Sequence, residues 1–75
     1  MSSKPNSVIT NAVAANLAAL SERLNEAARL AQEASTAMTN GKQNEAIGTA
    51  LGLEKILPDA EALFKAALSL HLYRD

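Results

Sequence analysis

The sequence predicts an all-α protein built as an antiparallel helical hairpin. Apolar residues recur at helical spacing over the first half, Asn40-Gly41 interrupts the pattern near the middle, and helical spacing resumes afterwards. Of the 75 residues, 16 are Ala and 11 are Leu, two strong helix formers. A chain of this length has room for one hydrophobic core, so we expect a single domain.

The first residues differ in character from the rest. Residues 1–6 carry Ser, Lys, Pro and Asn without periodicity, which predicts a disordered lead-in. The hairpin domain is expected to occupy residues 7–75.

A first helix is predicted over about residues 7–39, because apolar residues recur there at alternating steps of four and three. The expected stripe consists of Val13, Leu17, Leu20, Leu24, Ala27, Ala31, Ala34 and Met38. Charged residues fall away from this stripe, and Arg29 stands at pairing distance from Glu33 along a helix.

A turn is predicted at Asn40-Gly41, since glycine closes a helix in a left-handed conformation without steric cost. Asn40 or Asn44 is a candidate cap for the next helix. A short turn makes the two helices antiparallel neighbours, so residues whose numbers sum to about 82 should face each other. Small residues then meet near the turn. Gly48 and Gly52 fit a close approach of the two backbones, with local flexibility as the alternative.

The second half continues at helical spacing but contains Pro58, which lacks a backbone donor and crowds the preceding turn. Two arrangements are compatible with it. One helix over about residues 43–73 is kinked at Pro58, or Pro58 lies in the first turn of a third helix. Leu57 is a poor helix cap, which favours the kink.

The apolar arc of this second half is wider than one partner helix covers. We expect the first helix to be contacted by Leu53, Leu57, Ala60, Phe64 and Ala67. The residues expected to bind a partner are Ile56, Leu63, Phe64, Leu70 and Leu72. Large apolar side chains exposed together mark an interaction surface. The alternative is that this arc closes a three-helix core or a homodimer.

Composition argues against several classes of function. With no Cys and one His, His71, the chain cannot build a Cys-His pair, a zinc finger or a two-histidine metal site, so we expect neither an enzyme nor a bound cofactor or metal. No small-molecule site is evident. A net charge of −1 without a basic stripe argues against nucleic acid. No apolar run approaches the length of a membrane span, and a cytoplasmic protein is expected.

One segment resembles part of a known repeat. Gly41, Glu45, Ala46, Ile47 and Pro58 stand at the separations found in the second helix and exit turn of a tetratricopeptide repeat. The resemblance covers about half a repeat, and Leu53 and Leu68 depart from the pattern. It implies a helix-turn-helix packing unit and no peptide-binding groove. In size and hairpin organisation the chain is also similar to the small helical co-chaperones of type III secretion needle subunits.

These observations predict a small protein–protein interaction module of the adaptor or co-chaperone type that acts through an apolar helical face. Its partner is another protein or a second copy of the chain. The alternatives are a homodimeric structural protein and a small regulator without direct nucleic-acid contact.

Overall fold

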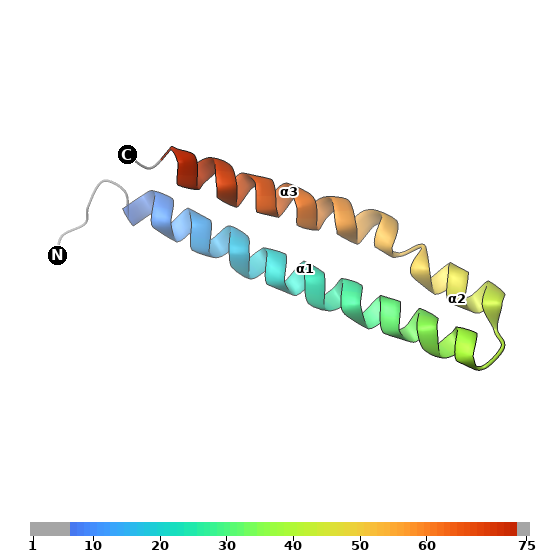
Figure 1. The fold of residues 1–75 in the computed structure, drawn as a ribbon. Coiled ribbons are helices and arrows are strands. Elements are labelled where there is room, and N and C mark those ends of the chain that lie inside the picture. The colour runs from blue at the N-terminus through green and yellow to red at the C-terminus, as the bar shows by residue number, and fades with distance from the viewer. Residues whose placement is uncertain (1–6, 74–75) are drawn as a thin grey trace.

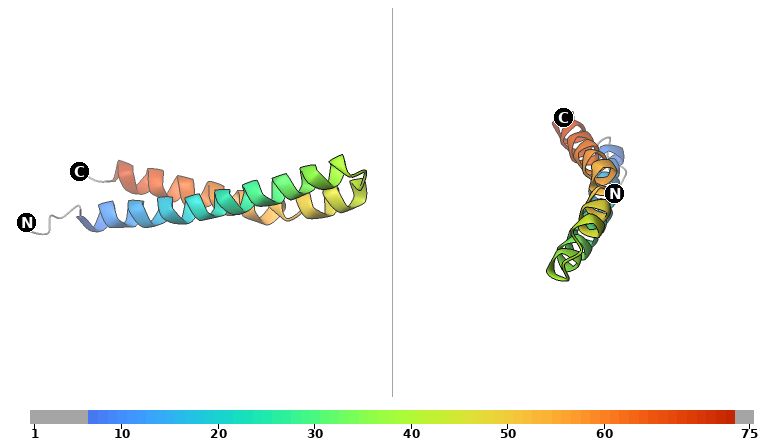
Figure 2. Two further views of the ribbon diagram at one scale, coloured as in Figure 1. Left: turned by 90° about the horizontal axis from the view of Figure 1, so that it is seen from below. Right: turned by 90° about the vertical axis from the view of Figure 1, so that its right-hand side faces the viewer.

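The computed structural model describes residues 7–73, which form three helices (Figure 1). Helix α1 spans Ser7–Thr39, α2 spans Gln43–Ala50 and α3 spans Leu53–Leu72. Helices α2 and α3 follow one another and return along α1, so the molecule has two long arms that cross along their length (Figure 2). The predicted all-α class is confirmed, and α1 has the predicted bounds. The lead-in expected over residues 1–6 lies outside the described residues.

The turn between the arms is a glycine-closed helix end. Gly41 has a φ of 76°, in the left-handed region that glycine adopts without strain. The amide of Lys42 donates to the carbonyl of Ala37 at 2.9 Å, and that of Gly41 to Met38 at 2.9 Å, which is the Schellman pattern of helix termination. Lys42 precedes α2 as its cap residue without a side-chain capping bond, so neither asparagine caps this helix.

The seam between the arms follows a seven-residue repeat, as in coiled coils. On α1 it consists of Ile9, Val13, Asn16, Leu20, Arg23, Ala27, Leu30, Ala34 and Ala37. On the returning arm it consists of Ala46, Thr49, Leu53, Ile56, Ala60, Leu63, Ala67 and Leu70. All of these residues are buried or half-buried, and the alternation of three and four continues without a shift from α2 into α3.

The core of the hairpin is made almost entirely of alanine. The buried apolar residues are Ala27, Ala37, Ala46, Ile56, Ala60 and Ala67. Among the described residues no large side chain is fully buried. Small side chains allow a close approach of the helices but remove little apolar area from water. The two arms therefore pack closely around a thin core.

The interruption in the second arm lies at Leu51-Gly52, so the prediction that placed it at Pro58 is wrong. Pro58 lies inside α3. Both junction residues keep right-handed helical angles, but the amide of Gly52 donates to Thr49 at 3.2 Å and that of Glu54 to Leu51 at 3.0 Å. These bonds span three residues instead of four, which tightens the turn.

Two local features explain why the bend precedes the proline. Pro58 cannot donate to the carbonyl of Glu54, and its ring crowds that carbonyl, which disfavours regular helix on its N-terminal side. Gly52 has the lowest helix propensity of the residues in that stretch apart from Pro58 itself. We therefore attribute the bend to strain from Pro58 that is taken up at the weak glycine position.

Gly52 also lies against a side chain of the other arm. A Cβ atom added to Gly52 would lie 2.8 Å from Cδ1 of Leu30, whereas one added to Gly48 would have nothing within 4 Å. The predicted close approach of the two backbones is thus wrong at Gly48, and at Gly52 the neighbour from the other arm is a side chain.

Candidate interaction surface

One side of the hairpin carries a line of large apolar side chains beside the seam. On α1, Leu17, Leu24 and Met38 lie at seven-residue steps or multiples of them, which keeps them on one edge of the helix. The predicted α1 stripe combined seam residues with this edge, so it is correct for Val13 and Leu20 but not for the edge residues, which are about half exposed.

The returning arm places apolar side chains on the same side. Leu17 and Val13 of α1 line a shallow groove together with Phe64, Ala67, Leu68 and His71 of α3. Nearer the turn, Ile47, Leu51 and Leu57 line a second apolar depression at the junction of α2 and α3.

We call this surface the apolar face. It comprises Leu17, Leu24, Met38, Ile47, Leu51, Leu57, Phe64 and Leu68, each between 46% and 55% exposed. It extends along both arms, from the open end to the turn. Such a gathering of large apolar side chains is the usual signature of a binding surface.

The residues predicted to bind a partner separate into two groups. Phe64 and Leu72 are exposed, and Phe64 lies on the apolar face. Ile56 is buried at 8% exposure, and Leu63 and Leu70 are half-buried on the seam. The prediction that this second group forms an outward arc is therefore wrong, because these residues pack toward α1.

Of the residues expected to contact α1, Leu53, Ala60 and Ala67 do lie on the seam, and the error concerns the two largest ones. Leu57 and Phe64, expected to face α1, are exposed, and their neighbours Ile56 and Leu63 face it instead. Sequence reasoning thus missed Leu17, Leu24 and Leu57 as surface residues. One feature of the sequence could have identified them. Leu17 and Leu24 repeat at seven-residue spacing directly beside a second, complete seven-residue repeat, which is the seam.

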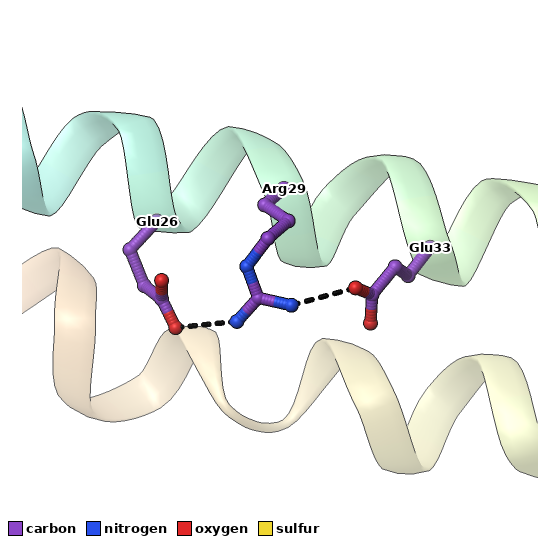
Figure 3. A network of polar contacts seen from close by, with 3 residues as sticks. All are labelled: Glu26, Arg29 and Glu33. Carbon is purple, nitrogen blue, oxygen red and sulfur yellow. Dashed lines mark hydrogen bonds and ion pairs between the residues drawn. The ribbon is translucent and has the colours of Figure 1, made fainter.

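Away from the apolar face, the half of the hairpin nearer the turn carries charged residues. In Figure 3 the side chain of Arg29 projects from α1 between two carboxylates. Its Nη2 donates to Glu26 Oε2 and its Nη1 to Glu33 Oε2, each at 2.6 Å. The hydrogen bond from Arg29 lowers the pKa of Glu26. Near the turn, Lys42 and Glu45 line a polar depression.

Metal-ligand clusters and membrane-spanning helices are both absent from the described part of the chain. Over residues 7–73, no three His, Asp or Glu side chains gather as ligands for a metal ion. Across the same range, the helices lack the combination of length and apolarity needed to cross a bilayer.

Comparisons with protein-family models, with curated proteins and with solved structures found no match to this chain. The resemblance to half a tetratricopeptide repeat therefore stays a prediction.

Proposed function

We propose that the chain is a small protein–protein interaction module, of the adaptor or co-chaperone type, whose working surface is the apolar face. The observation that carries this proposal is the difference between the apolar face and the rest of the hairpin. The face presents large apolar residues from both arms, and ion-paired charged residues lie away from it. A hairpin evolved only for solubility has no reason to gather its leucines on one exposed side.

The distribution of side-chain size supports the same proposal. The interior of the hairpin uses alanine, while Leu17, Leu24 and Phe64 stand outside it. Fully burying a leucine or phenylalanine contributes about 1.5–3 kcal/mol relative to exposure, so much of the available hydrophobic free energy is not used within one hairpin. A protein partner seated on the apolar face would recover it.

The heptad spacing of the face favours a helical partner. Residues that repeat every seven positions form a straight edge that another helix can follow with knobs-into-holes packing. The partner is therefore expected to present an amphipathic helix with apolar residues at the same spacing.

Site-specific photo-crosslinking in cells tests the proposal. A benzophenone amino acid replaces Phe64 on the apolar face or, as a matched control, Ala62, which is exposed two residues away on the polar surface of the same helix. Light-dependent protein adducts at position 64 and none at position 62 would support the proposal. Adducts at neither position, or equally at both, would contradict it.

A further inference from the structure

We infer that the occupant of the apolar face is a second copy of this chain, packed face to face to form a four-helix bundle. This inference rests on the proposed function, because it names the partner of the same surface. Three properties of the hairpin point to a second copy: its thickness, the dimensions of its face and the charge of that face.

The hairpin is a single layer of helices. Its extents are 58 × 19 × 11 Å, and its radius of gyration is 17.4 Å, against about 11 Å for a compact domain of 75 residues. Helical domains normally bury an apolar stripe between two layers. A second hairpin on the apolar face supplies the missing layer. The large apolar side chains of the two faces then form a core between the two hairpins.

The size of the face fits a stable dimer. The broad side of the hairpin, on which the apolar face lies, has an outline of 58 × 19 Å, or about 1,100 Å², whereas a standard specific interface buries about 800 Å² on each partner. An occupant must also cover both arms over their length. A second copy presents a face with the same two arms and the same spacing, which is the self-complementarity that two-fold symmetry requires.

The charge of the face allows two copies to meet. Along the edge of α1 between Leu17 and Met38, the outward residues interleaved with the large ones are small and uncharged. These interleaved residues are Ser21, Ala28, Ala31 and Ser35. On α3, two acidic residues lie beside the face: Glu54 lines the depression with Leu57, and Glu61 is ion-paired with Lys65 at 3.2 Å. With a net charge of −1 per chain, two copies repel one another only weakly.

Sedimentation equilibrium of the purified full-length chain tests this inference. At about 100 μM we expect a mass of twice 7.9 kDa, dissociating on dilution. Phe64→Ser and Leu24→Ser, which remove apolar contacts from the centre of the face, should each raise the dimer Kd at least about tenfold. Ala62→Ser, on the polar surface, should leave the Kd unchanged, and far-UV circular dichroism checks that each variant remains helical.

The outcomes separate this inference from the proposed function. A wild-type monomer at about 100 μM would overturn the second copy, and so would a dimer whose Kd is unchanged by both face variants. If the chain is a monomer while position 64 crosslinks to a different protein in cells, the interaction module stands and its partner is another protein. A monomer without crosslinks at position 64 would contradict both proposals.

Discussion

Replacing each of the two glycines of the second arm with alanine gives opposite expectations for stability. Both positions have right-handed helical surroundings, where alanine is favoured over glycine by about 0.5–1 kcal/mol. At Gly48 nothing opposes this gain, because an added Cβ meets open space. We expect Gly48→Ala to raise the free energy of unfolding by about 0.5–1 kcal/mol, and hence to raise Tm by about 2–8 °C.

At Gly52 the same gain is opposed by a steric overlap. The added Cβ would lie 2.8 Å from Cδ1 of Leu30, closer than carbon atoms pack without displacement. Moving Leu30 off its rotamer costs about 0.5–1.5 kcal/mol, so Gly52→Ala should leave Tm unchanged or lower it. Replacing Leu30 with valine removes the Cδ1 atom. In the Leu30→Val background, Gly52→Ala should therefore become stabilising.

Thermal unfolding followed by circular dichroism measures these changes in Tm. The variants compared with the wild type are Gly48→Ala, Gly52→Ala, Leu30→Val and the double variant that combines the last two. Protein concentration is held fixed, because association would make Tm depend on it. Neither glycine belongs to the apolar face, so the substitutions act on the hairpin itself. If Gly52→Ala stabilised the wild-type chain as much as Gly48→Ala does, the argued contact between the arms would be refuted.

Three further substitutions test other parts of the fold. Gly41→Ala forces a side chain into a left-handed conformation and should lower stability by about 1–2 kcal/mol in denaturant unfolding, with Gly41→Asn less harmful. Ile56→Ala should cost about 2–5 kcal/mol because the side chain is buried on the seam, while Lys55→Ala on the exposed surface beside it should be nearly neutral. Because the hydrogen bond from Arg29 lowers the pKa of Glu26 in the folded chain, its contribution is present above the carboxylate's unfolded pKa and is lost as pH falls through the folded pKa. An acid titration of Tm should show this loss in the wild type and not in Arg29→Ala, and about 1 M salt should reduce the difference.

The features that the sequence predicted well depend on local chemistry. The turn at Gly41 follows from the conformational freedom of one residue, and α1 follows from helix formers that repeat over many turns. The position of the bend does not follow from Pro58 alone, because Gly52 lies before it in the same arm. Its position depends on how Pro58, Gly52 and the approach of Leu30 act together, and only the last of these comes from the other arm.

The choice of the inward edge of each helix depends on long-range packing and was predicted only in part. Asn16 and Arg23 occupy seam positions although they are polar. Asn16 satisfies its amide by donating to the carbonyl of Ala12 at 2.9 Å within its own helix. Arg23 is half-buried there, as a long side chain can be when its apolar stem is covered and its charged end reaches water. A prediction that ranks residues by hydrophobicity alone turns Leu17 and Leu24 inward instead.

Three residues that the sequence predicts to face the other arm instead belong to the apolar face. Leu17, Leu24 and Leu57 look like core residues, but the hairpin leaves them about half exposed, while the seam beside them includes the polar residues Asn16 and Arg23. Within one hairpin, these three leucines contribute only part of their hydrophobic free energy, because about half of each side chain stays in contact with water. Sequence rules and structure are expected to disagree where function imposes its own demand. This disagreement is what the proposed second copy would resolve, because a hairpin seated on the apolar face would bury Leu17, Leu24 and Leu57.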